Sequence, residues 1–193
     1  MSLVSDIRAF KPCNEQEERD RIIMLHYLET HPDALSRQNE TAHFTASAWI
    51  LNKEHTKILM IHHNIYNSWS WTGGHADEES DLEGVAVREA LEETGIKQIK
   101  VLGDGIFSLE ILTVDGHEKR GGYVSSHLHL NVTYLLEADE TDELSVKHDE
   151  NSGVCWFTPE DASEASSEPW MRDRIYHKLN MKMIDYVNKY LFT

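Results

Sequence analysis

The spacing of hydrophobic and polar positions predicts a helical beginning to the chain. Residues 14–31, NEQEERDRIIMLHYLETH, open with Asn14 and Glu17 at the spacing of a capping box. The apolar residues that follow recur where a helix can bury them. Residues 1–40 are therefore expected to form an N-terminal helical extension. The positions expected to be buried are Ile22, Ile23, Leu25 and Leu28.

From residue 43 the pattern becomes that of strands. HFTASAWILN and KILMIHH are rich in β-forming residues and are separated by NKEHT, which predicts a hairpin. Strand-like segments follow at residues 99–114 and 123–136, and a short strand, VCWF, comes after a polar connection. The stretch NSWSWTGGHAD reads as a loop by composition.

Helical spacing returns at residues 81–94, where Gly95 ends the pattern, and at residues 170–192. Pro159 is expected to start a short helix between them. This order of elements predicts an α/β (α+β) fold with a mixed β-sheet sandwiched between helices. We expect the main domain, including the C-terminal helix, to occupy residues 41–193.

Composition narrows the classes of function. A chain of 193 residues that is 40% hydrophobic can bury one good core. Its net charge of -16 argues against binding DNA or RNA, although a small anionic substrate can bind if divalent cations neutralise it. Two cysteines without metal-ligand spacing, and no apolar run of membrane length, predict a cytoplasmic protein without a membrane partner.

Acidic residues are unusually frequent between His75 and Gly95. This segment contains eight carboxylates and one basic residue, Arg88. On a helix, Glu89, Glu92 and Glu93 share an arc of about 100° beside an apolar arc. Like charges at this spacing each cost roughly 0.2 to 0.5 kcal/mol when solvated. Arg88 can pair with Glu92, but one guanidinium cannot neutralise three carboxylates, whereas Mg²⁺ or Mn²⁺ can. A solvated acidic helix face is the ordinary alternative.

The 23 residues GHADEESDLEGVAVREALEETGI, residues 74–96, resemble the Nudix box, G-x(5)-E-x(7)-R-E-U-x-E-E-x-G-U, in which U is a bulky aliphatic residue. Ser80 replaces the first glutamate of the pattern, and Ala90 is a weak match to U. We expect Glu79 or Asp81 to reach Arg88 instead, and Ser80 to cap the helix. The seven outright matches are Gly74, Arg88, Glu89, Glu92, Glu93, Gly95 and Ile96.

The resemblance implies a pyrophosphohydrolase that cleaves a phosphoanhydride bond with a metal-activated water. The expected catalytic residues are Arg88, Glu89, Glu92, Glu93 and Glu150. The three box glutamates and Glu150 would also bind the metal, together with the backbone carbonyl of Gly73 or Gly74. Glu150, in DENSGVCW, would be a further ligand or the general base; a solvated loop carboxylate is the other interpretation.

Several residues beside the box are candidates for binding the substrate. Tyr66 or Trp69 can stack on a base, although aromatic residues often only fill a core, as we expect of Trp71. His127 and His129 share one strand face, as zinc ligands do, but no further partner at recognisable spacing accompanies them. Strand histidines that bond neighbours or touch substrate are the favoured interpretation. The candidates for substrate binding are Tyr66, Trp69, Gly74, His75 and His129.

The expected substrate is a small nucleotide-like molecule, such as a nucleotide sugar, ADP-ribose or a nucleoside triphosphate. A catalytically idle nucleotide-binding module is the second hypothesis, supported by Ser80. An isopentenyl-diphosphate isomerase is the third, but neither Cys13 nor Cys155 lies in a strand before the box. The terminal helices can cap the site or form a homodimer interface.

Overall fold

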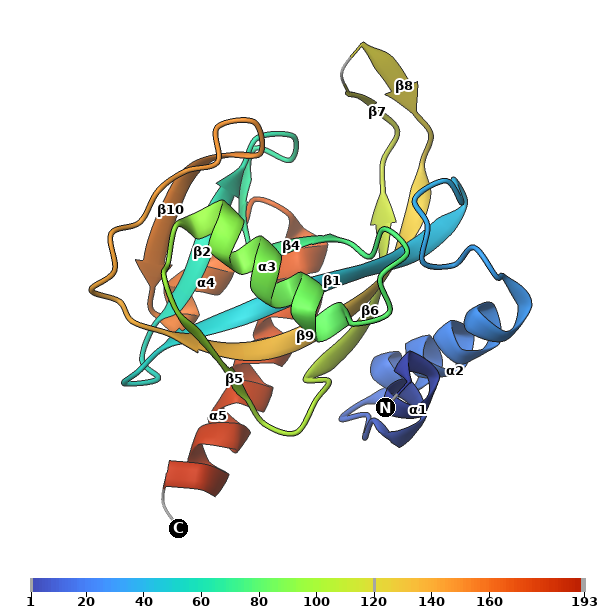
Figure 1. Ribbon diagram of the computed structural model, residues 1–193. Helices are drawn as coiled ribbons and strands as arrows, with labels where there is room; N and C mark the ends of the chain where they lie inside the picture. The colour runs from blue at the N-terminus through green and yellow to red at the C-terminus, as the bar shows by residue number, and fades with distance from the viewer. Residues whose placement is uncertain (1, 120, 192–193) are drawn as a thin grey trace. The chain divides into compact units, whose positions relative to one another are not determined.

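A computed structural model describes residues 2–119 and 121–191 of the chain (Figure 1). Its strands form an eight-stranded sheet and a separate hairpin of β7 and β8. The sheet has the order β10-β2-β1-β9-β5, and in addition β3 pairs with β2, β4 with β1 and β6 with β9.

The helices are α1 (Leu3–Ala9), α2 (Glu15–Thr30), α3 (Leu82–Thr94), α4 (Pro159–Ala165), the π-helix η1 (Met171–Tyr176) and α5 (His177–Leu191). The strands are β1 (Ala42–Asn52), β2 (Ile58–His63), β3 (Ser68–Ser70), β4 (Thr72–His75), β5 (Ile99–Leu102), β6 (Ser108–Val114), β7 (His117–Lys119), β8 (Gly122–Val124), β9 (His127–Ala138) and β10 (Asn151–Phe157). The predicted α/β class, a large mixed sheet flanked by helices, is confirmed.

The chain divides into two compact units, each built from three segments. The first unit comprises Met1–Ser47, Gly73–Ala86 and Gly103–Tyr134, and the second unit comprises Ala48–Thr72, Val87–Leu102 and Leu135–Thr193. Strands β1 and β9 and helix α3 contribute residues to both units. The predicted boundary between residues 40 and 41 stays a prediction.

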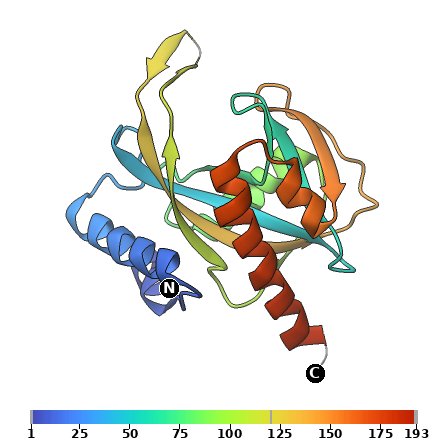
Figure 2. The same cartoon turned by 180° about the vertical axis from the view of Figure 1, so that it is seen from behind.

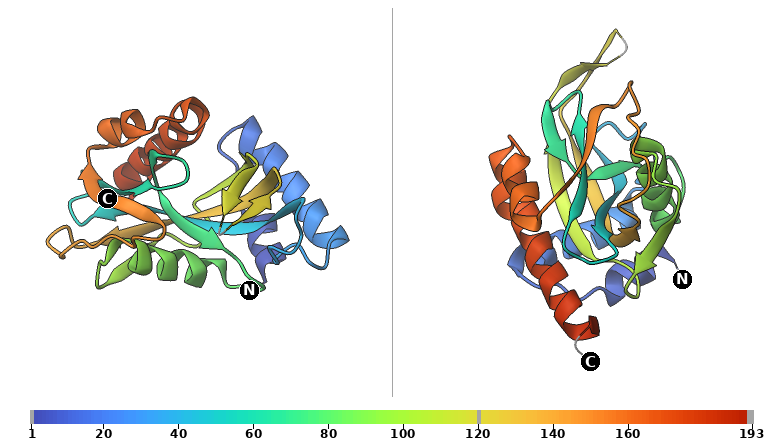
Figure 3. Two further views of the ribbon diagram at one scale, coloured as in Figure 1. Left: turned by 90° about the horizontal axis from the view of Figure 1, so that it is seen from above. Right: turned by 90° about the vertical axis from the view of Figure 1, so that its left-hand side faces the viewer.

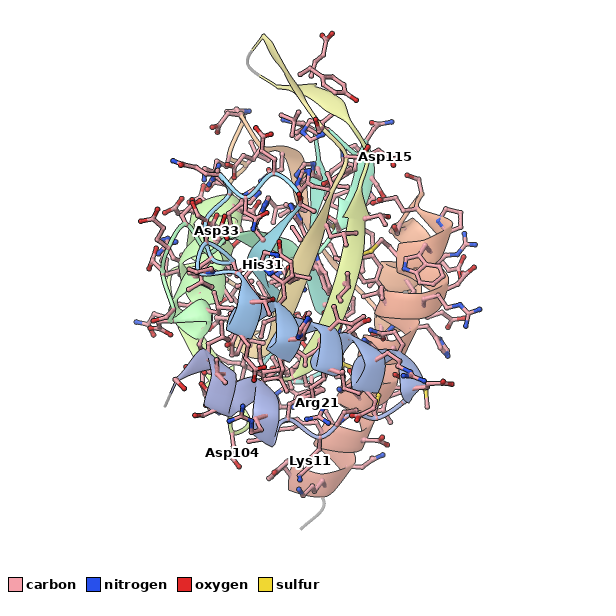
Figure 4. All side chains as sticks on the ribbon, turned by 90° about the vertical axis from the view of Figure 1, so that its right-hand side faces the viewer. Lys11, Arg21, His31, Asp33, Asp104 and Asp115 are labelled. Carbon is pink, nitrogen blue, oxygen red and sulfur yellow. The ribbon has the colours of Figure 1, made fainter. Side chains whose placement is uncertain are left out.

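In the first unit, the predicted capping box fixes α2. The side chain of Asn14 accepts a hydrogen bond from the backbone N–H of Glu17 at 2.9 Å, and the Glu17 carboxylate accepts one from the backbone N–H of Cys13 at 2.8 Å. The same buried carboxylate accepts a hydrogen bond from Ser108 on β6 at 2.7 Å, so the cap also joins the helix to the sheet. Figure 4 shows α2, with Arg21 labelled, lying across the strands of this unit.

The expected burial of α2 was partly wrong. Ile22 and Ile23 are 48% and 50% exposed, and Met24 is the apolar residue of this helix that is fully buried. Most of the surface of α2 is polar, and only a narrow stripe of the helix packs against β6. The apolar spacing in the sequence therefore did not show which residues lie on that stripe.

The two long predicted strands each consist of two shorter ones. Gly103 and Gly105, with φ of +80° and +119°, end β5 and separate it from β6. β6 then pairs with β9 from Ser108↔Thr133 to Val114↔His127. The hairpin of β7 and β8 extends beyond these two strands (Figure 1).

In the second unit, β2 lies between β1 and β10. Ile50 pairs with Leu59, which confirms the predicted hairpin, and Leu59 also pairs with Trp156 of β10. The prediction of a loop over residues 67–77 was wrong for β3 and β4, which are short strands. Glycine and polar composition does not prevent strand pairing where a sheet edge supplies partners, and β3 pairs with β2 from Ile61↔Ser70 to His63↔Ser68.

Helices cover both faces of the second unit's strands. Figures 2 and 3 show α4 and α5 on one face of β2 and β10, and the left view of Figure 3 shows α3 on the other. Helix α4 begins at Pro159, as predicted, and the side chain of Thr158 caps it. Tyr176 stacks on Trp49 and meets the edge of Trp71, with ring centroids 5.3 and 5.6 Å away, so Trp71 is a core residue as expected.

The helical tail follows its predicted spacing. Ile175, Leu179 and Met183 are buried. Among the described residues, no helix has both the length and the apolar character that crossing a membrane requires.

Candidate functional site

Helix α3 presents the three candidate glutamates from its second half. The helix starts where the Asp81 side chain accepts a hydrogen bond from the backbone N–H of Gly84 at 3.0 Å. Asp81 is therefore the N-cap, and the expectation that Ser80 would cap the helix was wrong. Asp is as good an N-cap as Ser, and its position one residue later matches the first helical residue, Leu82.

The three glutamates differ in exposure. Glu93 is buried, with 2% of its surface exposed. The side chain of Glu89 is 16% exposed and that of Glu92 is 48% exposed. Exposure to solvent thus increases from Glu93 through Glu89 to Glu92, so this face of the helix is not uniformly solvated.

A lysine outside the helix joins this cluster. The Lys147 ammonium lies 3.0 Å from a carboxylate oxygen of Glu92 and 3.0 Å from one of Glu150. Burial favours a lower pKa for Lys147, but its hydrogen bonds with Glu92 and Glu150 outweigh burial and raise that pKa above its ordinary value. Lys147 therefore stays charged at neutral pH and bridges the two carboxylates.

Backbone contacts hold the loop before β10 against the end of α3. The N–H of Ser145 donates to the carbonyl of Thr94 at 2.8 Å, and the Asn151 side-chain amide donates to the carbonyl of Glu93 at 2.9 Å. Gly95 takes φ of +75° at this junction, and a side chain there would collide with Ser145. Glu150 consequently lies at the cluster and is not a free loop carboxylate.

The electrostatic state of Glu89 reflects crowding. Burial is the largest cause that raises its pKa above the ordinary value of 4.5, while Lys147 lowers it and the neighbouring Glu92 and Glu150 raise it further. Arg88 approaches Glu89, with 3.9 Å between a guanidinium nitrogen and a carboxylate oxygen. Even with the charged side chains of Lys147 and Arg88 nearby, the surroundings disfavour the charged form of Glu89.

The donor set of this cluster fits a hard divalent cation. Carboxylate oxygens are the ligands that Mg²⁺ and Mn²⁺ prefer, and a bound cation would favour the charged form of Glu89. The carboxylate cluster, as we name it, consists of Glu89, Glu92, Glu93 and Glu150, which all belong to the second unit. The expected roles of these residues remain proposals.

The two aromatic candidates of the second unit have different surroundings. Tyr66 is 40% exposed and lies beside His63, with ring centroids 4.5 Å apart. Trp69 is half-buried in β3, where it meets the edge of Phe157 at 4.9 Å. Tyr66 is therefore the more exposed of the two rings, with His63 beside it, and Trp69 mainly packs on the sheet.

The glycine and histidine candidates lie in the first unit. Gly73 and Gly74 belong to β4, which approaches β1 so closely that a side chain at Gly73 would meet Ser47 Oγ at 2.5 Å. His75 ends the same strand, and its ring centroid is 5.1 Å from that of His129 on β9. The structure thus brings His75 and His129 together.

Two more histidines complete a group in the first unit. His43 on β1 places its ring 5.1 Å from the ring of His75 and 5.0 Å from that of His127. Nε2 of His127 lies 3.1 Å from Nε2 of His129. Burial lowers the pKa of His43, and a hydrogen bond from its ring to the carbonyl of Asn39 opposes this to a smaller extent. His43 is therefore neutral at physiological pH.

Comparison with known proteins decides the family. The sequence profile of the NUDIX domain matches residues 41–179, which is most of the chain. The chain belongs to the NUDIX family. This confirms the resemblance inferred from the box, and it agrees with the predicted class of Nudix pyrophosphohydrolase.

Individual Nudix relatives are distant. A nucleoside diphosphate-linked moiety X motif 6 protein of Xenopus laevis is 39% identical over 49 residues, which is 24% of this chain and only 23% of that protein's length. The C. elegans Ap4A hydrolase binary complex has a TM-score of 0.55 and 22% identity, covering 76% of this chain and 98% of that one. A NUDIX-family hydrolase from Clostridium perfringens has a TM-score of 0.51 and 20% identity, covering 74% and 96%. These structures share the Nudix fold with this chain.

Sequence reasoning missed two residues of the Nudix chain that matter here. Lys147 was missed because the acidic helix was judged by its own residues, and the lysine comes from a loop more than fifty positions later. His43 was missed as a partner of His127 and His129 because strand adjacency is not written in local spacing. The sequence offered a histidine at the start of the strand predicted from residue 43 and two alternating histidines within the strand predicted at residues 123–136.

Proposed function

We propose that this Nudix protein is a pyrophosphohydrolase that uses Mg²⁺ or Mn²⁺ to cleave a phosphoanhydride bond. The substrate class is a nucleoside diphosphate linked to another moiety, such as a nucleotide sugar, ADP-ribose or a nucleoside triphosphate. The observation that carries the proposal is the mostly buried carboxylate of Glu89, whose pKa is raised by burial and which shares its surroundings with Glu92 and Glu150. Such a group is expected where a cation binds during function.

Each carboxylate has a proposed role. Glu89, Glu92 and Glu93 are the proposed ligands of the cation in the second unit. The backbone carbonyl of Gly73, in the first unit, stays a predicted ligand. When bound, the cation lowers the pKa of the attacking water and neutralises the diphosphate. Glu150 is the proposed further ligand or general base, because it lies in the same cluster through Lys147.

Lys147 and Arg88 are proposed to manage charge in this cluster. The Lys147 ammonium lies 3.0 Å from a carboxylate oxygen of Glu92 and 3.0 Å from one of Glu150. Its positive charge offsets the repulsion between these two carboxylates. A divalent cation that binds the same oxygens must compete with the ammonium, which can then turn to a substrate phosphate. Arg88 positions Glu89 from the same helix.

Several residues are proposed, each within its own unit, to contact the substrate. Tyr66, with its exposed ring, is the better candidate for base stacking, which contributes about 1–3 kcal/mol per base. Trp69 is retained as the alternative. Gly74, His75 and His129 are the proposed contacts to the phosphates, by backbone approach and by imidazole N–H donors.

The test is a screen in which metal and products are both resolved. Purified protein is incubated with nucleotide sugars, ADP-ribose, nucleoside triphosphates and dinucleoside polyphosphates, the last because a structural neighbour is an Ap4A hydrolase. Products are separated by chromatography and the cleaved bond is assigned by ³¹P NMR. We expect turnover of at least one class with Mg²⁺ and none with chelator. Folded protein that cleaves nothing at saturating Mg²⁺ would contradict the proposal.

A nucleotide sensor without turnover is the second candidate, favoured by Ser80 in the box and by Lys147 among the carboxylates. Calorimetric binding of a nucleotide that is recovered intact would select it. The expected setting for either function is the cytoplasm, with no nucleic-acid or membrane partner and a homodimer as a possible assembly. Cys13 and Cys155 are exposed, and the described residues contain no disulfide.

A further inference from the structure

We propose that the first unit carries a second metal site, built from His43, His75, His127 and His129, that binds Zn²⁺ or a similar late transition-metal ion. The four residues are defined here as the histidine cluster. They come from three strands that are far apart in the sequence: β1, β4 and β9. The site is separate in chemistry from the carboxylate cluster, because its side-chain donors are nitrogen atoms and imidazole suits zinc, copper, iron and nickel, whereas Mg²⁺ prefers oxygen.

Geometry is the first support. One ring nitrogen from each of His43, His75 and His129 lies within 4.8 Å of the others. Nitrogen ligands of a tetrahedral zinc ion, at about 2.0–2.1 Å from the metal, are about 3.4 Å apart. A bound ion would therefore draw the ring nitrogens of His43, His75 and His129 closer together than the 4.8 Å within which they lie. His127 and His129 are already close to it, with 3.1 Å between their Nε2 atoms.

The second support is a buried nitrogen of His43. His43 is 3% exposed, and its Nε2 is fully buried with no hydrogen-bond partner among the residues that the structure describes. A buried polar atom of this kind costs about 1–3 kcal/mol when it stays unsatisfied. A metal ion bound to Nε2 would satisfy it.

The third support is the orientation of two rings by backbone carbonyls. Nδ1 of His43 lies 2.9 Å from the carbonyl oxygen of Asn39, and Nδ1 of His127 lies 2.8 Å from that of Ser125. A ring nitrogen beside a carbonyl oxygen carries the hydrogen, and in the neutral ring of His43 this leaves Nε2 with its lone pair. Metal-binding histidines characteristically donate their other N–H to such an acceptor.

A nearby carboxylate adds negative charge without competing as a ligand. Asp77 forms a salt bridge with Arg37, which lowers the pKa of Asp77, and both His75 and His43 interact with it electrostatically. The carboxylate therefore stays charged beside the histidine cluster. Three imidazoles, those of His43, His75 and His129, match the ligand sets of zinc sites with an open position, and His127 would hold the ring of His129 in place.

The test measures metal binding, not hydrolysis. Protein without a histidine tag is stripped with chelator and titrated calorimetrically with Zn²⁺ in the presence of excess Mg²⁺. The ligands are then identified by X-ray absorption of the zinc-loaded protein. We expect one equivalent of Zn²⁺ per chain and a first shell with imidazole scattering. Co²⁺ should give the visible absorption of a four-coordinate ion.

Variants locate the site. His43→Gln and His127→Gln should each weaken Zn²⁺ binding by at least about tenfold, the smallest loss expected even for a partner that only orients a ligand. His26→Gln, on the exposed side of α2, is the matched control and should bind as the wild type does. Circular dichroism checks folding, and if His43→Gln does not fold, the partly exposed His127 decides the question.

The outcomes separate this proposal from the proposed hydrolase activity. Glu93→Gln should keep the Zn²⁺ site while losing Mg²⁺-dependent turnover. Failure to bind one equivalent of Zn²⁺, a first shell of oxygen only, or full affinity in the folded His127→Gln variant would each overturn the histidine site and leave the carboxylate site untouched.

Discussion

The carboxylate cluster of the second unit and the histidine cluster of the first unit gather similar residues by different means. The carboxylates come mainly from one helix, where Glu89, Glu92 and Glu93 are neighbours by helical geometry. The histidines come from three strands and meet only because those strands are folded together. The first arrangement could be inferred from spacing in the sequence, and the second could not.

The two clusters also differ in how they handle charge. Three acids and Glu150 accumulate negative charge, which Lys147 and Arg88 reduce in part. In the histidine cluster, the buried ring of His43 is uncharged, because burial lowers its pKa. A hard dication therefore fits the first cluster and a softer ion fits the second.

The largest expected effect comes from Glu93→Gln. Removing this buried carboxylate should lower Mg²⁺-dependent turnover by about 10²–10⁴-fold, the range for loss of an essential acid–base or ligand group. The protein should stay folded, because glutamine is nearly isosteric. Steady-state kinetics on the best substrate of the screen measures the effect, with exposed Glu143→Gln as control. Near-normal turnover would remove the carboxylate cluster from the mechanism.

A smaller effect is expected from Lys147→Met. Without the competing ammonium, Mg²⁺ should bind the carboxylates more tightly, and the half-saturating Mg²⁺ concentration should fall by about fivefold, in line with a partly exposed ion pair. Lys100→Met makes the same change in net charge elsewhere in the second unit. If the Mg²⁺ requirement rises instead, Lys147 serves the substrate and not the metal site.

The cap of α3 gives a stability prediction. Asp81→Ala should cost about 1 kcal/mol of unfolding free energy, since it removes the acceptor for the Gly84 N–H. Ser80→Ala should have little effect. Urea unfolding of both variants compares them, and equal losses would mean that the helix start is not fixed by Asp81.

The smallest effect concerns Glu89 and pH. Because burial raises the pKa of Glu89 in the folded state, the folded protein binds its proton more tightly than the unfolded chain does. The tighter binding of this proton stabilises the folded state fully when the pH is below the pKa of Glu89 in the unfolded chain. The stabilisation is lost as pH rises through the higher pKa of Glu89 in the folded protein. Without divalent cations, Glu89→Gln should therefore be more stable than the wild type at neutral pH by a few tenths of a kcal/mol.

Thermal unfolding across pH tests this sign. The advantage of Glu89→Gln should shrink as pH falls from neutral toward the ordinary glutamate value of 4.5, and it should change little further below that value. An advantage that is constant with pH would mean that Glu89 is not strained by its charge.

Local signals in the sequence predicted local structure well. The spacing of Arg88 to Glu93 identified the helix and the family, and Asn14 with Glu17 identified the start of α2. Predictions failed where tertiary contacts decide the outcome. Ile22 and Ile23 are exposed although they fit a helical pattern, and β3 and β4 pair as strands in spite of a loop-like composition.

The candidate site divides in the same way. The glutamates were evident because a helix brings residues three and four apart together. Lys147 and His43 reach their clusters through a loop contact and a strand neighbour, for which a single sequence contains no direct sign. Lys147 reduces the negative charge of the carboxylate cluster. His43 joins His75 and His129 in the histidine cluster.

The most direct measurement is anomalous diffraction from crystals grown with Mn²⁺ and a non-hydrolysable ADP-ribose analogue. We expect at least one Mn²⁺ within about 2.5 Å of carboxylate oxygens among Glu89, Glu92 and Glu93, in contact with the diphosphate. Clear density for the analogue without a metal peak beside these three glutamates would contradict the account.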